Sequence, residues 1–583
     1  MQIRSVHAVL GEVLRYALAC ALTMTLSHTS NAAASPADII FTNGIVRTQD
    51  PTHSVAQALA VSGGRIVYVG NDSGAAGLVG PRTRLIDLAG RALLPGLADA
   101  HVHPALGEFL NHRLCNVRAF SVEEGLRRLR ACEAKAPPGD WVVGYGWYDL
   151  DNAEFDAVTR RDLDAISKNR KVVAISKDLH TTWVNSKTLA ELGINRATPQ
   201  PSGGAIVHDS ATGEPSGVLL DAAAFPILQR VQHDSPYAVP TTALFRQAIT
   251  YLNSLGITSI VEALADDDAL AAYHELDRAG QLTMHVSAAF GVQPETFAAE
   301  IPRLHQLRSK VQSPHLHLDF IKAFGDGNPE VGMTYLLAHG GPVTAATRGY
   351  YTDAQASDLV ALAEREDFSI FVHVIGDAAA RQWLDAVASA RRARPQTDLR
   401  HTLTHLCWVA DEDLPRFRAN GVIANIQEGW LAPAAYGGPA GYDYARSTAA
   451  GPIGPWLAGH MLPYGPLVGA GARLSAGSDW FYTEENPWYA IEAGATSADP
   501  GSVNSRPMLP EHAVSVETLL DALTSGSAYQ MHLELQTGTL ETGKAADLIV
   551  VNQDPLAVPV SRVHDTKVLL TLFEGRIVYE AKP

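Results

Sequence analysis

The sequence predicts an α/β protein built on a TIM-like (β/α)8 barrel, with a small β-sandwich formed from both ends of the chain. Three observations support this fold class. Apolar, strand-like runs alternate with helical stretches through the middle of the chain, often enough for about eight β/α units. Several of these runs end in a polar residue, as in "FSIFVHVIGD" and "ARLSAGSDW". Short β-rich runs with hairpin turns lie at both ends of the chain.

Residues 1–34 have the pattern of a secretory signal peptide. Arg4 and Arg15 precede the apolar run "YALACALTMTL", and three consecutive alanines ending at Ala34 supply a small-residue cleavage pattern. A membrane anchor is the alternative, but the apolar run is short for crossing a bilayer. Cleavage after Ala34 would leave Ser35 as the first residue. We therefore expect a periplasmic or secreted protein with no stable membrane anchor after cleavage.

The composition is that of an ordinary globular enzyme, with 46% hydrophobic and 18% charged residues. The 45 Lys and Arg residues face 62 Asp and Glu residues, which gives a formal net charge of −17. Nucleic acids and anionic membranes bind basic surfaces, so this acidic balance argues against both as partners. A small-molecule substrate is the expected partner. The oligomeric state stays open, a homo-oligomer included.

Beyond residue 34 the cysteines are Cys115, Cys132 and Cys407. An odd number leaves at least one thiol unpaired, so we do not expect a disulfide framework to hold the fold. Which cysteines pair, if any, stays open. Cys407 lies two positions beyond His405 on the same strand face, and we expect it to pack rather than to act in catalysis.

The two ends of the mature chain are predicted to share one small β-sandwich. Residues 35–94 contain "DIIFTNGIVRTQD" and "ALAVSGGRIVYVG", whose Asn-Gly and Gly-Gly pairs are typical of hairpin turns. Residues 536–583 contain "ADLIVVNQDP" and "KVLLTLFEGRIVYE". The short run "GRIVY" occurs in both segments. A single sandwich with a large domain inserted between its halves is the simplest arrangement.

Residues 95–535 are predicted to form the barrel. The active site of such a barrel lies where its strands end, so polar residues at strand ends are candidates for chemistry. The candidate strands end at His103, Ser176, Glu262, Phe290, Lys322, His373, His405, Gln427 and Asp479. Two segments, 104–250 and 428–466, are too long for simple connections. Their Trp, Tyr and Leu content favours ordered covers over the barrel mouth.

Six polar side chains at these strand ends are candidate metal ligands. Strand periodicity places His101 and His103 on one face, because side chains alternate along a strand. One His-x-His pair taken alone is as often a pair of structural histidines. A buried lysine requires a carboxylate partner, a shifted pKa or chemical modification. Imidazole and carboxylate ligands suit zinc and related divalent ions. The complete set is His101, His103, Lys322, His373, His405 and Asp479.

The chain resembles the amidohydrolase superfamily, and within it the amidohydrolase-3 subgroup, which includes N-substituted formamide deformylases. The stretches that carry the resemblance are "LLPGLADAHVHP", "HTTWVNSKTLAELGI", "GEPSGVLLDAA", "IKAFGDG", "VHVIGDAA", "RHTLTHL", "AGSD" and "GTLETGKAADLIVVNQDP". The resemblance implies hydrolysis of carbon–nitrogen bonds with one or two zinc ions. It implies that His101 and His103 hold the more buried ion, and that His373 and His405 hold the other. Carboxylated Lys322 would bridge the two, and Asp479 would contact the first ion and the nucleophile.

The chain departs from the subgroup at two places. The subgroup usually has Asp-Gly-Ser after its lysine strand, whereas this chain has Asp-Gly-Asn at residues 326–328. Gly-Ser-Asp is commonly followed by small residues and proline, whereas Trp480, Phe481 and Tyr482 follow here. The predicted metal ligands are unaffected, so these differences concern substrate recognition.

Candidate substrate-binding residues come from both predicted insertions and from the three residues after Asp479. His180, Trp183 and Asn185 of "LHTTWVN" either face the substrate or anchor the first insertion by hydrogen bonds. Aromatic side chains could line an apolar pocket, which is usual for small-molecule sites, or could pack within loops. These aromatic candidates are Trp430, Tyr436, Trp480, Phe481 and Tyr482.

Together with the candidate ligands, the resemblance implies a metal-dependent amidohydrolase that cleaves a non-peptide amide or formamide-like bond of a small, partly apolar substrate. Metal-activated water would attack, and Asp479 would accept the proton and pass it to the leaving nitrogen. One alternative is a mononuclear deaminase, which typically has a glutamate shortly after its third histidine; "HVIGDAAA" has none. Another is a secreted binding protein without turnover, which the intact ligand set argues against.

Overall fold

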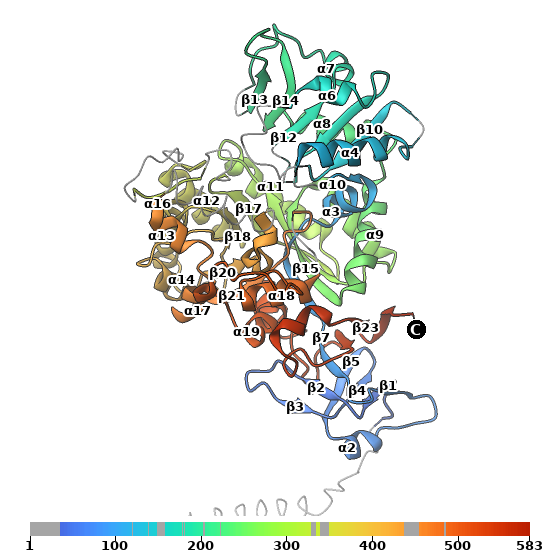
Figure 1. Ribbon diagram of the computed structural model, residues 1–583. Coiled ribbons are helices and arrows are strands. Elements are labelled where there is room, and N and C mark those ends of the chain that lie inside the picture. The colour runs from blue at the N-terminus through green and yellow to red at the C-terminus, as the bar shows by residue number, and fades with distance from the viewer. Residues whose placement is uncertain are drawn as a thin grey trace, which may run out of the picture.

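The computed structural model describes most of the chain from residue 35 onward. A barrel lies between a β-sandwich and a smaller α/β unit (Figure 1). No helix within the described residues is long and apolar enough to span a membrane. The predicted signal peptide lies outside this part of the chain. The described residues are 35–582 except 119–120, 138, 148–157, 178, 180, 202–203, 222, 328–333, 339–348, 437–453 and 483–485.

Eight strands form a parallel, nearly closed barrel, as predicted. The strands in barrel order are β8 (Leu97–Val102), β15 (Ile257–Ala265), β16 (His285–Gly291), β17 (Leu316–Phe324), β18 (Ser369–Val374), β19 (Thr402–His405), β20 (Ile423–Ile426) and β21 (Arg473–Ala476). Gly477 allows the two ends of this sheet to approach each other closely. A Cβ at this position would lie 2.3 Å from the backbone nitrogen of His101, so only glycine fits. The Asp479 N–H then donates to the His101 carbonyl at 2.7 Å.

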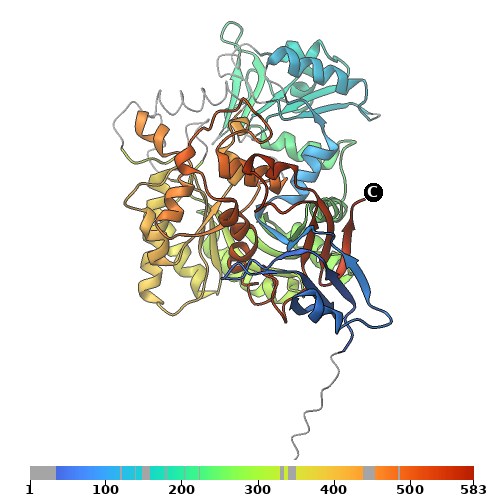
Figure 2. The ribbon, with the colours of Figure 1, turned by 60° about the horizontal axis from the view of Figure 1, so that its bottom comes forward.

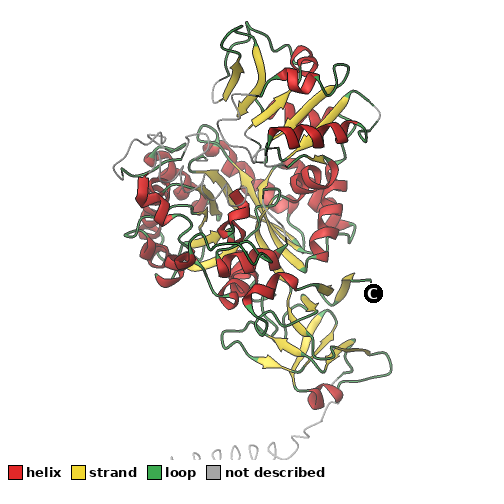
Figure 3. Cartoon of the chain, viewed as in Figure 1, coloured by secondary structure: helices red, strands yellow, loops and turns green. Residues whose placement is uncertain are grey.

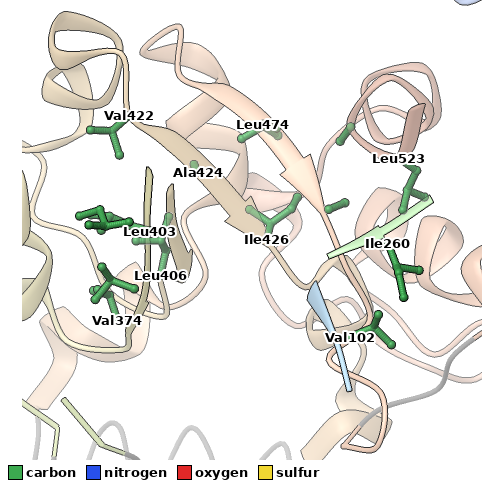
Figure 4. Close-up of a cluster of buried hydrophobic side chains, with 14 of the residues drawn as sticks. Val102, Ile260, Val374, Leu403, Leu406, Val422, Ala424, Ile426, Leu474 and Leu523 are labelled. Atoms are coloured by element: carbon green, nitrogen blue, oxygen red, sulfur yellow. The ribbon is translucent and has the colours of Figure 1, made fainter. Parts of the chain in front are cut away.

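Helices surround the barrel strands (Figure 3) and bury the outward-facing strand residues. Figure 4 shows part of this core, where Val102, Ile260, Leu403, Ile426 and Leu474 lie among buried aliphatic side chains. The helices of this region are α9 (Thr241–Ser254), α10 (Asp267–Arg278), α11 (Phe297–Val311), α12 (Asp353–Arg365), α13 (Asp377–Ala393), α14 (Leu414–Asn420), α16 (Gly454–His460), α17 (Tyr464–Gly469), α18 (Pro487–Thr496), α19 (Val516–Asp521) and α20 (Ser527–Gln530).

A strand irregularity decides which face of β17 points into the barrel. The pairing register between β16 and β17 shifts between Ala288 and Ala289. Beyond that point Phe320 packs in the interior cluster, whereas Ile321 and Ala323 pack in the outer core. Because side chains alternate along a strand, Lys322 faces the barrel interior.

Both ends of the chain build the β-sandwich, as predicted. Within one of its two sheets, β7 from the first half of the sandwich pairs with β22 from the second half. One sheet has the order β5-β4-β1-β6 and the other β24-β23-β22-β7-β2-β3. Apolar side chains from both termini, Phe41, Leu59 and Leu572 among them, form the core between the sheets. The strands are β1 (Ile39–Thr42), β2 (Ile45–Arg47), β3 (Val55–Ala56), β4 (Ala58–Ser62), β5 (Arg65–Gly70), β6 (Arg84–Asp87), β7 (Ala92–Pro95), β22 (Leu548–Val551), β23 (Val568–Phe573) and β24 (Arg576–Glu580).

The first predicted insertion is largely a folded unit with its own sheet, seen beside the barrel in Figures 1 and 2. We call this unit, residues 115–235, the insertion domain. A disulfide joins Cys115 to Cys132 within it. Its elements are β9 (Cys115–Asn116), α4 (Val122–Glu133), β10 (Trp141–Tyr145), α6 (Arg160–Asp164), β11 (Lys171–Ile175), β12 (Thr181–Val184), α7 (Ser186–Glu191), β13 (Gly204–His208), β14 (Pro215–Asp221) and α8 (Phe225–Asp234).

The strand predicted to end at Ser176 is not a barrel strand, and that prediction is wrong. It is β11, which pairs in parallel with β10 and antiparallel with β12 inside the insertion domain. Its apolar run "KVVAI" is buried like a barrel strand, so its pattern alone could not distinguish the two sheets. At the other end of the predicted insertion, α9 packs into the barrel core through Phe245 and Leu252.

His315 connects the β-sandwich to the barrel. Its Nε2 lies 3.3 Å from Glu574 Oε2 in the turn between β23 and β24, and its Nδ1 lies 2.7 Å from Asp277 Oδ1 on α10. The hydrogen bond to Glu574, together with that to Asp277, outweighs burial and raises the pKa of His315 from 6.5 to about 9. The raised pKa means that the folded chain favours the charged ring. This stabilisation is therefore fully present below pH 6.5 and is lost as the pH rises through about 9.

We expect His315→Ala to lower the free energy of unfolding by about 1–2 kcal/mol at about pH 6, a value reduced for the partial exposure of the ring. At about pH 10 the difference from the unsubstituted protein should approach zero. Urea unfolding across this pH range measures the effect. His233→Ala, on the exposed side of α8, is the control and should change the free energy of unfolding by less than about 0.5 kcal/mol. An equal loss at both pH values would mean that the His315 ring contributes packing rather than charge.

Candidate metal centre

The six predicted ligands all lie at the carboxyl ends of barrel strands. The His101 and His405 ring centroids are 4.7 Å apart, the His373 and His405 centroids 4.4 Å, and the His101 and His103 centroids 5.5 Å. Four ligands are strand residues, while His103 directly follows β8 and Asp479 follows β21. The strand residues are His101 on β8, Lys322 on β17, His373 on β18 and His405 at the end of β19.

Asp479 is the point at which three of the histidines converge. Its Oδ1 lies 3.4 Å from His101 Nε2 and 3.2 Å from His103 Nε2. One ligand atom each from His101, His405 and Asp479 lie within 4.8 Å of one another. The backbone of Asp479 has φ 54° and that of His405 has φ 74°, a region that non-glycine residues rarely adopt. Such conformations persist where the surrounding structure enforces them, often at functional sites.

The hydrogen bonds behind His101 fix which of its nitrogens faces the centre. His101 Nδ1 lies 2.7 Å from Thr404 Oγ1, and the Thr404 hydroxyl donates its proton to Asn425 Oδ1 at 2.8 Å. Thr404 Oγ1 must therefore accept a hydrogen bond from His101 Nδ1–H. The Nε2 lone pair of His101 is then directed toward Asp479, the arrangement typical of a metal-ligating histidine.

His405 is held in the same way by Gln427. Its Nδ1 lies 2.9 Å from Gln427 Oε1, and the Gln427 amide nitrogen donates to Asn425 Oδ1 at 3.0 Å. That donation fixes the amide orientation, so Gln427 Oε1 accepts from His405 Nδ1–H. The Nε2 of His405 is left for the centre. Asn425 thus connects the partners of both histidines.

The donor set fits a divalent cation. Burial, and next the charge of Lys322, hold the pKa of His101 well below its usual value; burial, and next His373, do the same for His405. Both rings are therefore neutral, with Nδ1–H engaged elsewhere. Imidazole lone pairs facing a carboxylate have no proton between them, so their mutual repulsion is relieved by a cation. Nitrogen and carboxylate ligands of this kind suit zinc.

Lys322 brings a buried amine to the same place. Its Nζ lies 5.0 Å from the ring centroids of both Phe324 and Phe371. Burial lowers its pKa from 10.5 to about 7, although the nearby charge of Asp479 opposes the shift. A substantial fraction of the amine is therefore uncharged at neutral pH, and an uncharged amine is nucleophilic.

Glu262, within β15, is a carboxyl group beside the site that the predicted ligand set did not include. Its Oε1 lies 4.0 Å from His103 Nδ1, and its Oε2 accepts a hydrogen bond from Tyr273 at 3.0 Å. Burial raises the pKa of Glu262 to about 8. The Nδ1 atom of His103 therefore faces a carboxyl group, whereas the Nδ1 atoms of His101 and His405 face Thr404 and Gln427.

Aromatic rings lie against the ligand histidines. Trp430 stacks on His405 with an interplanar angle of 3° and a centroid distance of 5.2 Å, and Tyr482 packs edge-on against Trp430. The Phe481 ring lies 5.6 Å from that of His103. The buried indole N–H of Trp430 has no hydrogen-bond partner among the described residues. These three of the predicted aromatic candidates therefore lie beside the centre.

The other predicted substrate-binding residues have different surroundings. Trp480 is fully buried against Tyr251 of α9. Trp183 donates to the Thr159 carbonyl, and Asn185 caps α7, so both stabilise the insertion domain. A direct substrate contact by these three residues stays a prediction. His180 and the side chain of Tyr436 lie outside the described residues.

Two of the motifs that carry candidate ligands are also joined to each other through the backbone. The buried carboxylate of Asp326 in "IKAFGDG" accepts from the backbone N–H groups of Ile375 and Gly376 in "VHVIGDAA" at 2.9 and 2.8 Å. It also accepts from Tyr335 N–H at 3.0 Å. The loop after β17 is thereby fixed to the amino end of α13.

The sequence profile of the amidohydrolase family matches residues 84–579, a span that includes all six ligands. The chain belongs to the amidohydrolase family. Among its relatives is the N-substituted formamide deformylase of Arthrobacter pascens, 26% identical over 93% of this chain and 98% of that protein. The putative amidohydrolase YtcJ of Bacillus subtilis is also 26% identical, over 86% of this chain and 91% of its own.

A solved structure shows the same fold. The uncharacterized metal-dependent hydrolase of Pyrococcus horikoshii OT3 superposes with a TM-score of 0.69 at 21% identity, over 90% of this chain and 99% of that one. Family membership and the group formed by buried His101, buried His405 and Asp479 together make this amidohydrolase a metal-dependent hydrolase.

Proposed function

We propose that the protein is an exported amidohydrolase that cleaves a non-peptide carbon–nitrogen bond, amide or formamide-like, in a small and partly apolar substrate. The observation that carries this proposal is the convergence of His101 Nε2, His103 Nε2 and the Asp479 carboxylate at the barrel mouth. The hydrogen bonds of Thr404 and Gln427 support it, because they direct the ligating nitrogens inward.

One or two zinc ions are the proposed cofactors. His101, His103 and Asp479 would hold the first, and His373 with His405 the second. A divalent cation at such a site lowers the pKa of water from about 15.7 toward about 7 and so supplies hydroxide at neutral pH.

Lys322 is proposed to carry a carboxyl group and to bridge the two ion positions. Its uncharged amine would form a nitrogen–carbon bond to carbon dioxide with release of one proton, which turns a buried neutral amine into an anion. The burial of Lys322 and its electrostatic contact with Asp479 support this assignment.

Asp479 is proposed to move the proton. Its carboxylate accepts the proton that water loses when the water oxygen attacks the carbonyl carbon. The same carboxyl group then gives that proton to the amide nitrogen, and the carbon–nitrogen bond breaks. One group can serve both steps, so the reaction needs no serine or cysteine nucleophile.

Three features support the substrate class and export. Trp430, Phe481 and Tyr482 offer apolar faces beside the centre, and the Trp430 indole N–H can donate to a polar atom of the substrate. Among the relatives is a protein named for N-substituted formamides. The Cys115–Cys132 disulfide is typical of oxidising compartments, which agrees with the predicted signal peptide.

We expect the purified protein to contain up to two zinc ions per chain and to lose turnover on chelation, with recovery on adding Zn²⁺. Elemental analysis, followed by a screen of formamides, amides, lactams, esters and aminopurines, measures both properties. Hydrolysis of formamides or amides is the expected result. Conversion of aminopurines alone would favour the deaminase, and bound metal without turnover would favour the binding protein. Metal-free protein whose activity resists chelators would contradict the proposal.

A further inference from the structure

The loop that carries Asp479 is held by two different parts of the molecule. On the barrel side, Asp479 N–H donates to the His101 carbonyl at 2.7 Å, and His103 N–H donates to the Trp480 carbonyl at 3.0 Å. The Ser478 hydroxyl donates to Asp99 Oδ2 at 2.6 Å. These contacts fix the start of the loop to β8.

The far side of the same loop contacts the insertion domain. Tyr145, the last residue of β10, is buried and places its hydroxyl 3.0 Å from the Phe481 carbonyl. The same hydroxyl lies 3.0 Å from the Lys177 carbonyl within the insertion domain. One phenolic proton therefore serves a carbonyl in each part of the molecule.

The Phe481 carbonyl lies inside the turn that follows Asp479. Tyr482 N–H donates to the Asp479 carbonyl at 2.8 Å, which closes that turn. Since the turn is short and Asp479 has the strained φ of 54°, a shift of the Phe481 peptide changes the backbone of Asp479. A second contact supports the loop, because Lys177 Nζ lies 4.6 Å from the Tyr482 ring centroid.

We propose that Tyr145 is a positioning residue for Asp479, so that the insertion domain completes the metal centre instead of only covering it. The inference rests on the proposed role of Asp479 as ligand and proton carrier. Its physical basis is that outer hydrogen bonds orient metal ligands, and their loss typically costs metal affinity or activity about 10- to 100-fold.

The test compares Tyr145→Phe with Tyr237→Phe. Tyr237 belongs to the same hydrophobic cluster and is also buried, but it forms no described contact with the Asp479 loop. Each substitution removes one buried hydroxyl. We expect Tyr145→Phe to weaken Zn²⁺ binding about 10-fold in competition with a chelating dye and to alter the absorption spectrum of the Co²⁺-loaded protein. Tyr237→Phe should stay within about 2-fold and leave that spectrum unchanged.

Two further variants keep the test decisive. Asn111 also donates to the Phe481 carbonyl, at 3.3 Å, so Asn111→Leu should weaken Zn²⁺ binding in the same direction if Tyr145→Phe fails to fold. In an Asp479→Ala background, which has no ligating oxygen at position 479, Tyr145→Phe should have little additional effect on Zn²⁺ binding, because residues that act through one another are not additive.

Equal Zn²⁺ affinities and Co²⁺ spectra for Tyr145→Phe and Tyr237→Phe would overturn the proposal. A full effect of Tyr145→Phe on Zn²⁺ binding in the Asp479→Ala background would also overturn it. Once a substrate is identified, Tyr145→Phe should lower kcat and leave KM little changed. The metal measurements need no substrate, so they test Tyr145 even if none of the screened compounds is hydrolysed.

Discussion

Asp479→Asn is expected to lower turnover by about 10² to 10⁴, the usual contribution of a general acid–base group, while most of the metal is retained. Asparagine keeps the size of aspartate and one oxygen that can face a cation, but it cannot accept a proton. The loss should therefore appear in kcat at every pH tested. Steady-state kinetics with elemental analysis of the same preparation measures both quantities.

Asp385→Asn is the matched control for this substitution. Asp385 lies on α13 with an exposed side chain that pairs with Arg416, so neither rate nor metal content should change. Loss of metal and activity together would show that Asp479 acts only as a ligand. A fully metallated Asp479→Asn protein with a near-normal rate across the pH range would rule out the proton-transfer role.

Lys322→Ala is expected to lower activity by at least about 10²-fold, because removing one preorganised electrostatic group from an active site has effects of that size. If the functional form is a carboxylated lysine, short carboxylic acids such as acetate or propionate should restore part of the rate, since they can occupy the space and supply the anion. Kinetics over a range of acid concentrations measures the recovery, and mass spectrometry of the native protein tests for the added carboxyl group.

The same acids should not restore Asp479→Asn, which lacks a proton carrier and leaves no comparable space. Lys310→Ala, on α11 and away from the barrel mouth, should leave the rate unchanged. An inactive Lys322→Ala protein that no acid rescues, together with a native mass that shows an unmodified amine, would contradict carboxylation.

The barrel could be predicted because its strands are short apolar runs that end in polar residues. The run before His373 and the run before Asp479 each have this form, and each is a barrel strand. The same criterion misplaced the run before Ser176, because β11 is also buried on both faces. Apolar patterning reports burial, and burial alone cannot assign a strand to one of two sheets.

The candidate ligands could be predicted because metal ligation requires particular side chains at particular strand ends. The residues that orient these ligands could not be predicted. Thr404, Asn425 and Gln427 are ordinary polar residues, and their role depends on which strands are neighbours in the barrel. The alternation of Asn425 and Gln427 with apolar residues in "IANIQ" was the available signal. Trp183 and Asn185 show the opposite case. They belong to a motif that carries the family resemblance, yet their hydrogen bonds stabilise the insertion domain.

The disulfide also exceeded what the sequence could decide. With Cys115, Cys132 and Cys407 present, no counting argument selects the pair. The fold selects it by placing α4 against β9, where the Cα atoms of Cys115 and Cys132 are 5.9 Å apart. The third cysteine, Cys407, is buried with the barrel core, in agreement with the expected packing role.

The pairing of β7 with β22 has a consequence for how the chain is made. Leu94 lies opposite Ile549, about 450 residues later. At ribosomal rates of about 5–20 residues per second, the first half of the β-sandwich waits roughly 20–90 s for its partner strands. Throughout that interval the edge of β7 is an open template for pairing with other chains. A nascent chain that is stalled or truncated before β22 is therefore prone to aggregate, and chaperones that hold the emerging polypeptide would protect its earliest segment most.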